Sequence, residues 1–177
     1  MIRILYVCTG NTCRSPMAEY ITLRLAKEYN LSDRISVSSA GVAALPGAAM
    51  APAAVSALAR RGIENTEIHQ AGRATEDRIA NADLILAMST AHKEALVARY
   101  PGARDRIYTL LEYVSSLPPS AAADVNDERG GFMNQSHGSD IADPFGGGDD
   151  VYELTAAEIE DAVRRLLDHL RTQLGKS

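Results

Sequence analysis

A short run near the start of the chain combines residue types that can bind and cleave a phosphoryl group: Cys8, Thr9, Gly10, Asn11, Thr12, Cys13, Arg14 and Ser15. A thiolate at Cys8 is a strong nucleophile, and Arg14 supplies a planar fork of donors that suits two phosphoryl oxygens. Gly10 lets the backbone approach closely, so that the amides of residues 9–15 can converge on an anion. Ser15 can donate a hydrogen bond to the sulfur. The run therefore predicts a phosphate-binding loop that carries a cysteine nucleophile.

Cys8 and Cys13 are the two cysteines of the chain, and each also has a simpler interpretation. A cysteine at the end of a strand is often a small buried apolar residue, but the combination with Arg14 and Ser15 favours catalysis for Cys8. Cys13 is either structural filler or a resolving thiol that protects Cys8 from over-oxidation, so we treat it as a candidate redox partner. No Gly-Lys-Ser/Thr follows, which excludes the nucleotide-binding loop.

The histidines are scattered along the chain without the spacing of metal ligands: His69, His92, His137 and His169. A zinc site usually needs four ligands at characteristic spacings. We therefore expect no metal and no other cofactor. His69 and His92 are candidates for bracing the loop or the turns beside it.

Short apolar runs rich in β-branched residues alternate with helical patterns, which is typical of a parallel sheet covered by helices. The predicted strands are residues 2–7, 35–39, 83–88 and 106–110. Ser15 is the predicted N-cap of a first helix that runs to about residue 30, and Ser89 caps a helix that ends before Pro101. A second helix opens at Pro52 and ends at Gly62. The capping box from Thr155 to Glu158 predicts the start of a long final helix.

The fold class is therefore α/β, with one three-layer domain over residues 1–177, a four-stranded parallel sheet and helices on both of its faces. Ligands of such sheets bind at the carboxyl ends of the strands, and Cys8 follows the first strand. From about residue 115 to residue 141 the chain is rich in Ser, Pro, Ala, Gly and Asp and has no period. We expect a loop-like insertion there.

Charge and composition restrict the partners. The chain has 18 basic and 23 acidic residues, a net charge of −5, which disfavours nucleic acid and anionic membranes. No apolar run approaches the length of a membrane span, and the start of the chain has no signal-peptide pattern. We expect a cytoplasmic protein with a local device for binding anions. The sequence does not indicate an oligomeric state.

The run from Val7 to Glu19 resembles the signature of the low-molecular-weight protein-tyrosine phosphatase family. Three further motifs resemble segments of the same family: Ser39-Ala40-Gly41, Asp83–Met88 with His92-Lys93, and Asp143-Pro144-Phe145. The resemblance covers nearly the whole chain. It implies an enzyme that cleaves phosphorylated protein side chains through a phosphocysteine intermediate, without a metal.

The resemblance also assigns roles to residues. Cys8 attacks phosphorus, Arg14 stabilises the equatorial oxygens, and Asp143 protonates the leaving group and later activates water. Apart from the resemblance, Phe145 and Tyr152 are both candidates for flanking the substrate entrance, and Phe145, beside Asp143, is the better one. The predicted substrate- and phosphate-binding residues are Thr9, Gly10, Asn11, Thr12, Cys13, Ser15 and Phe145.

Thr12 bears on which phosphorylated side chain is the substrate. Tyrosine phosphatases of the family usually carry a larger aliphatic residue here, whereas a subgroup that resembles bacterial protein-arginine phosphatases carries Thr. The Asp-Pro-Phe-Gly-Gly form at residues 143–147 is similar to that subgroup. A hydroxyl can hydrogen-bond a guanidinium group or its attacking water, whereas an aliphatic side chain narrows the pocket around an aromatic ring. We expect a protein-arginine phosphatase, with a tyrosine phosphatase of the same mechanism as the alternative.

Two other functions fit the loop less well. A thiol-dependent arsenate reductase needs further cysteines as a relay, and none follows Cys13. A phosphoprotein-binding module without catalysis could lose its nucleophile or its acid, yet both Cys8 and Asp143 are present. An enzyme is therefore the favoured interpretation.

Overall fold

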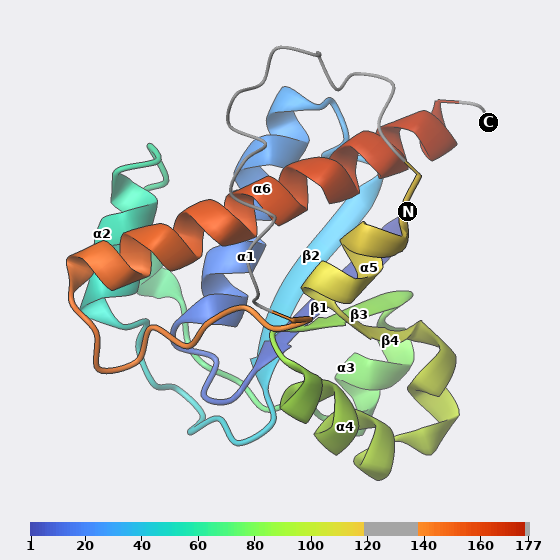
Figure 1. Ribbon diagram of the computed structural model, residues 1–177, viewed down its shortest axis with the longest axis horizontal. Coiled ribbons are helices and arrows are strands. Elements are labelled where there is room, and N and C mark those ends of the chain that lie inside the picture. Colours follow the sequence, from blue (N-terminus) through green and yellow to red (C-terminus); the bar gives the residue numbers. More distant parts are fainter. Residues whose placement is uncertain (119–137, 176–177) are drawn as a thin grey trace.

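Four parallel strands form the centre of the protein, whose computed structural model describes residues 1–118 and 138–175 (Figure 1). The strands are β1 (Ile2–Cys8), β2 (Ile35–Gly41), β3 (Leu84–Ala87) and β4 (Ile107–Thr109), in the order β2-β1-β3-β4. β1 pairs with β2 from Ile2 opposite Ile35 to Cys8 opposite Gly41. Because β1 lies between β2 and β3, its apolar side chains are buried on both faces. Its carboxyl end is the switch point of the strand order, where ligands of such sheets bind.

Helices cover both faces of the sheet, as the alternating pattern predicts. The helices α1 (Arg14–Glu28), α2 (Pro52–Ala59), α5 (Leu110–Ser116) and α6 (Asp149–Leu174) pack on one face over Ile4, Tyr6 and Leu86. The helices α3 (Glu76–Asn81) and α4 (Thr90–Arg99) pack on the other over Leu5, Val7 and Ile85. Figure 1 shows α3 and α4 together on the side of the sheet away from α6. The predicted three-layer α/β architecture is confirmed.

Two predicted helix starts are wrong. The first helix begins at Arg14 after the N-cap Cys13, so Ser15 lies within the helix rather than capping it. The last helix begins at Asp149 after Gly148, and Thr155 lies inside it, where its hydroxyl donates to the carbonyl of Val151 at 3.0 Å. Acidic residues in the first turn complement the dipole of α6. By contrast, Ser89 caps α4 as predicted and accepts a hydrogen bond from the amide of His92.

Four short elements were not predicted. They are α3, α5 and the 3₁₀ helices η1 (Thr66–Ile68) and η2 (Pro101–Arg106). α5 has a complete capping box between Thr109 and Glu112. It includes Ser115 and Ser116, which we expected to belong to the loop-like insertion at about 115–141. Residues 119–137 of that insertion lie outside the described residues.

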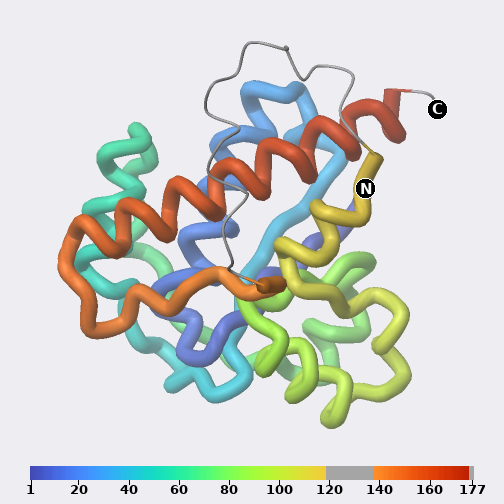
Figure 2. The backbone as a smooth tube through the Cα atoms, viewed as in Figure 1, coloured from blue at the N-terminus to red at the C-terminus, as the bar shows by residue number. Residues whose placement is uncertain are grey.

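The N-terminus and the C-terminal end of α6 lie on the side of the molecule opposite α2 (Figure 2). In the same view, the segment before α6 runs from the centre of the sheet past the loop that follows β1. None of the described helices is both long and apolar enough to span a bilayer.

Candidate active site

The loop between β1 and α1, residues 9–13, is fixed by hydrogen bonds to the backbone carbonyls of residues 8, 9, 11 and 12. Three of them accept hydrogen bonds from a neighbouring strand end, loop and helix start: Cys8 O from Val42 N (2.9 Å), Thr9 O from Ala43 N (3.0 Å) and Thr12 O from Ala51 N (2.9 Å). The carbonyl of Asn11 is 2.8 Å from Nε2 of His69. These peptide bonds are trans, so the amide that follows each carbonyl points the opposite way. The loop is therefore a cradle of amides suited to an anion.

Asn11 holds this loop from beneath. It is fully buried and adopts a left-handed backbone conformation with φ of 57°, which asparagine tolerates better than most residues. Its side-chain amide donates to Ser15 Oγ at 3.0 Å and to Ser39 Oγ at 2.8 Å, and its Oδ1 accepts from Gly72 N at 2.9 Å. With every side-chain atom engaged, the turn is fixed by three separate segments of the chain.

Glu19 closes this buried network, because Ser39 Oγ donates to its carboxylate at 2.5 Å. Burial raises the pKa of Glu19, and the hydrogen bond from Ser39 together with the charges of His69 and Arg78 opposes that rise. The sequence analysis did not identify Glu19. A usable signal existed, since Glu19 lies one helical turn after Ser15 and so on the same face of α1.

Cys8 lies at the end of β1 with two hydrogen-bond partners at its sulfur. Ser15 Oγ is 3.0 Å from Sγ, and the amide of Asn11 donates to Sγ over 3.3 Å. The sulfur also faces the N-terminal end of α1, where the helix dipole favours negative charge. The amide of Asn11 and the helix dipole favour negative charge on the sulfur, and Ser15 can add a hydrogen bond when its hydroxyl turns from the carbonyl of Ala40 toward the thiolate.

Arg14 and Asp143 meet across the loop although they are far apart in the chain. Arg14 is 5% exposed, and its guanidinium donates to Asp143 Oδ2 at 2.7 Å and to the carbonyl of Ile141 at 3.1 Å. The amide of Ile141 in turn donates to the carbonyl of Met88 at 2.8 Å. Asp143 remains half-exposed, and its Oδ1 accepts from the amide of Phe145 at 3.1 Å. The segment that carries Asp143 is therefore held both by Arg14 and by Met88, the residue after β3.

A cavity of about 250 Å³ opens between these groups. Its lining residues are Cys8, Thr9, Gly10, Thr12, Cys13, Arg14, Asp143 and Phe145. The structure thus brings together eight of the ten residues that the sequence analysis predicted for the site. The other two, Asn11 and Ser15, do not line the cavity themselves but contact the sulfur of Cys8, which does.

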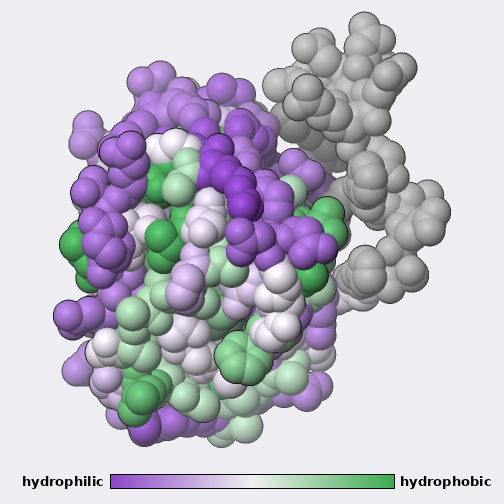
Figure 3. Space-filling view, turned by 90° about the vertical axis from the view of Figure 1, so that its left-hand side faces the viewer, coloured by the Kyte–Doolittle hydropathy of each residue, from purple (hydrophilic) through white to green (hydrophobic). Residues whose placement is uncertain are grey.

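The exposed lining of the cavity combines the ring of Phe145 with the half-exposed carboxyl group of Asp143. Phe145 is 81% exposed. Figure 3 turns the side that carries α2 and the segment before α6 toward the viewer, and its lower half is mainly neutral or apolar beneath a hydrophilic upper part. Within the lining, the amide cradle and Arg14 are the features that attract an anionic substrate.

Cys13, the candidate redox partner, is a buried free thiol like Cys8. Its Sγ lies 3.2 Å from the hydroxyl of Tyr152 and 3.6 Å from that of Thr12. Burial raises the pKa of Tyr152, and the hydrogen bond with Cys13 adds to that rise. Tyr152 was considered for the substrate entrance at the sequence level, but it is buried. The redox role of Cys13 stays a prediction.

In residues 1–118 and 138–175, no three His, Cys, Asp or Glu side chains lie close enough together to hold a metal ion. The donors around the cavity are backbone amides, a guanidinium, hydroxyls and thiols. Such a set holds a phosphoryl group by hydrogen bonds.

Comparisons with known proteins agree with this geometry. The family described as low molecular weight phosphotyrosine protein phosphatase matches residues 3–176. A protein-arginine-phosphatase of Bacillus subtilis is 38% identical over 168 residues, which is 95% of this chain and 96% of the relative. A low molecular weight protein-tyrosine-phosphatase, PtpB, of Staphylococcus haemolyticus is 33% identical over 93% of this chain and 97% of its own. A solved cysteine-to-serine mutant of a YwlE arginine phosphatase, with a phosphorylated active-site serine, superposes with a TM-score of 0.79 at 37% identity, covering 99% of this chain and 97% of that one.

Proposed function

Because the chain belongs to the low molecular weight phosphotyrosine protein phosphatase family, we propose that it hydrolyses phosphoarginine in proteins through a phosphocysteine at Cys8. The observation that carries the proposal is the meeting of Cys8, Arg14 and Asp143 at one cavity of about 250 Å³. The serine that carries phosphate in the mutant arginine phosphatase supports a covalent intermediate at the corresponding cysteine.

In the first step the phosphoryl oxygens accept hydrogen bonds from the amides of the cradle and from the guanidinium of Arg14. These oxygens compete with Asp143 for the same donors, which releases the carboxyl group from its 2.7 Å ion pair. The thiolate of Cys8 attacks phosphorus, an S–P bond forms, and the P–N bond to the substrate arginine breaks. The protonated carboxyl of Asp143 gives its proton to the leaving nitrogen.

In the second step water attacks the phosphocysteine. The carboxylate of Asp143 takes a proton from the water, the S–P bond breaks, and orthophosphate leaves with the thiolate of Cys8 restored. Hydrogen bonds from Ser15 and from the amide of Asn11 stabilise the sulfur as it takes up negative charge. Cys8 and Asp143 thus act in both steps of the reaction.

Thr12 supports arginine over tyrosine as the substrate. Its side chain lines the cavity with Cys8 and Arg14, and its carbonyl is fixed by the amide of Ala51. A hydroxyl at this point can pair with the polar guanidinium that carries the phosphoryl group. A larger aliphatic side chain would instead offer an apolar wall to an aromatic ring.

The test compares phosphoarginine and phosphotyrosine peptides of otherwise identical sequence on the wild type and on Thr12→Ile. We expect the wild type to prefer phosphoarginine, and the substitution to shift the ratio of the two kcat/KM values toward phosphotyrosine by at least about tenfold. Thr12→Ser, which keeps the hydroxyl, is the matched variant and should shift the ratio much less.

An unchanged ratio in Thr12→Ile would refute the role of Thr12 in selecting the substrate. A wild type that prefers phosphotyrosine would assign the chain to the tyrosine phosphatases of the family. Turnover that persists in Cys8→Ser would contradict the covalent mechanism itself.

A further inference from the structure

The first turn of α4 contacts the phosphate-binding loop through His92. Its Nε2 lies 2.7 Å from Oγ1 of Thr9, and its Nδ1 lies 2.8 Å from Oγ of Ser89. Ser89 is the N-cap of α4 and accepts a hydrogen bond from the amide of His92. Three side chains therefore form a continuous chain of hydrogen bonds from a helix cap to the rim of the cavity.

The direction of these hydrogen bonds follows from counting hydrogens. Ser89 is buried, and its oxygen already accepts from the amide of His92. Its single hydrogen is satisfied if it is donated to Nδ1 of His92, which makes Nδ1 the acceptor and Nε2 the protonated nitrogen. In the reverse arrangement that hydrogen would be buried without an acceptor among the contacts of residues 1–118 and 138–175, which is costly. Nε2 of His92 therefore donates to Thr9.

A consequence follows for the hydroxyl of Thr9. Since Oγ1 accepts from His92, its own hydrogen must point elsewhere, and Thr9 lines the cavity together with Cys8 and Arg14. Thr9 is exposed, whereas His92 and Ser89 are buried. The buried pair thus leaves Thr9 as an oriented donor on the wall of the cavity.

We infer that Thr9 donates a hydrogen bond from its side chain to a phosphoryl oxygen of the substrate, and that His92 is the positioning residue that fixes the direction of that bond. The inference rests on the proposed phosphatase function and adds a side-chain donor to the backbone cradle. Arg14 lies at the other end of the loop, so the two side chains hold different oxygens.

The position of His92 is fixed because Met88 and the first residue of α4, Thr90, contact residues 140–141, just before Asp143. The amide and the hydroxyl of Thr90 donate to Oδ1 of Asp140 at 2.7 and 2.8 Å, and Met88 O accepts from the amide of Ile141. Burial and the charge of Arg14 lower the pKa of His92, and Asp143 and Asp140 oppose them. A protonated imidazole would still donate from Nε2 to Thr9, so the direction of this hydrogen bond does not change with protonation.

The test measures inhibition by orthophosphate and kcat/KM for a phosphoarginine peptide. Thr9→Val removes the hydroxyl with little change of shape and should raise the inhibition constant and lower kcat/KM by about tenfold, the scale of one hydrogen bond to a charged group. Thr9→Ser restores the hydroxyl and should recover most of that loss. His92→Gln offers an amide near the place of Nε2 and should lose less than His92→Asn, whose amide corresponds to Nδ1.

The double variant Thr9→Val/His92→Asn separates positioning from a merely structural role. If His92 acts through Thr9, the double variant should be no worse than Thr9→Val, because the hydroxyl to be oriented has gone. His169→Asn, on α6 and outside the cavity lining, is the control for replacing a histidine and should match the wild type. Melting temperatures confirm that each variant is folded.

If the loss of kcat/KM in the double variant equals the product of the losses in the two single variants, the positioning role of His92 is wrong. An unchanged inhibition constant in folded Thr9→Val would overturn the contact with phosphate. A wild type without turnover of either phosphopeptide would instead refute the proposed function, so the two failures are distinguishable.

Discussion

Gly41, at the end of β2, shows how closely the site is packed at the scale of one residue. A Cβ atom at this position would lie 2.5 Å from the carbonyl oxygen of Thr9 and 3.0 Å from the amide nitrogen of Asn11. Both atoms belong to the phosphate-binding loop, and the two residues that follow Gly41, Val42 and Ala43, donate backbone hydrogen bonds to the carbonyls of Cys8 and Thr9. Glycine is needed here because the strand end must touch the loop.

We expect Gly41→Ala to displace the loop rather than to unfold the protein. The added methyl group should lower kcat/KM by at least about tenfold and cost about 1–3 kcal/mol of stability, the usual range for overpacking. Gly102→Ala is the control, because a Cβ atom there meets nothing within 4 Å. Enzyme assays and urea unfolding of both variants would check this, and full activity in Gly41→Ala would show that the loop does not depend on the contact.

At the scale of elements, the sequence predicts what repeats locally and misses what does not. The strands and the cap of α4 at Ser89 follow from apolar runs and from a hydroxyl before a helical pattern. The residues from Thr155 to Glu158 also match the sequence pattern of a capping box. However, α6 starts earlier, because the acidic pair Asp149–Asp150 already favours a helix start. Helices as short as α3 and α5 span too few turns for a period to be recognised.

The capping box of α5 gives a prediction at this scale. Thr109 Oγ1 accepts from the amide of Glu112, and the carboxylate of Glu112 accepts from the amide of Thr109, both at 3.1 Å. Thr109→Ala should therefore destabilise the protein by about 1 kcal/mol. Thr75→Ala, at the exposed cap of α3 with a longer 3.4 Å bond, should cost less. Thermal unfolding of both variants tests this order, and equal losses would contradict it.

At the scale of the whole molecule, distant segments converge on the site. Cys8 and Arg14 come from the first connection of the chain, Asn11 is held by Ser39 and Gly72, and Asp143 arrives from beyond the insertion. The motif at residues 8–15 could be predicted because it is continuous in sequence. The buried network beneath it could not, since no local pattern tells which serine or glycine reaches Asn11.

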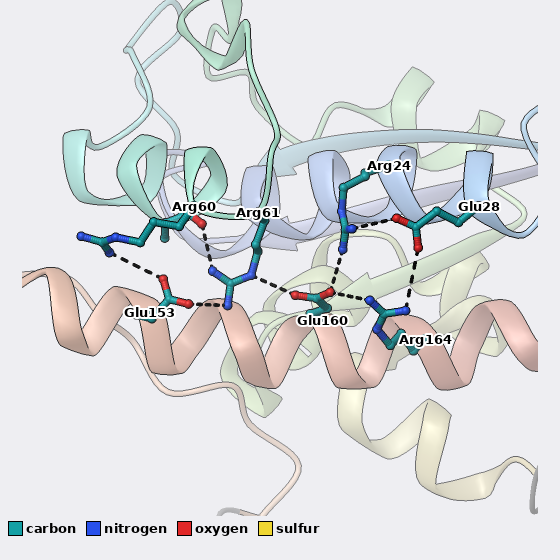
Figure 4. A network of polar contacts seen from close by, with 8 residues as sticks. Arg24, Glu28, Arg60, Arg61, Glu153, Glu160 and Arg164 are labelled. Carbon is teal, nitrogen blue, oxygen red and sulfur yellow. Dashed lines mark hydrogen bonds and ion pairs between the residues drawn. The ribbon is translucent and has the colours of Figure 1, made fainter. Parts of the chain in front are cut away.

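The layer of α1, α2 and α6 is held together by a second long-range arrangement, an ion-pair network (Figure 4). Its members are Arg24, Glu28, Arg60, Arg61, Glu153, Glu160 and Arg164. Glu160 is central to it, with oxygens 2.6 Å from Arg24, 2.9 Å from Arg61 and 2.7 Å from Arg164.

Glu160→Gln removes the negative charge on which three guanidinium groups converge. The Glu160 side chain is 17% exposed, so its loss should exceed the small cost of a surface pair and destabilise the protein by about 2 kcal/mol at neutral pH. Glu28→Gln is the matched control, because that side chain is 47% exposed, and should cost under about 0.5 kcal/mol. Urea unfolding of both variants at pH 7 measures the difference.

The pH dependence of the same variants identifies charge as the cause. Burial by itself would raise the pKa of Glu160, but the hydrogen bond and charge of Arg164 and the charge of Arg24 outweigh it, so that its pKa in the folded protein is lowered. An acid with a lowered pKa stabilises the folded state above its unfolded pKa of about 4.5, and that contribution is lost as the pH falls through the folded value. The gap in stability between wild type and Glu160→Gln should therefore be constant near neutral pH and shrink below about pH 4.5. A gap that persists unchanged in acid would mean that the substitution acts through packing, and α6 would then be anchored by its apolar face rather than by this network.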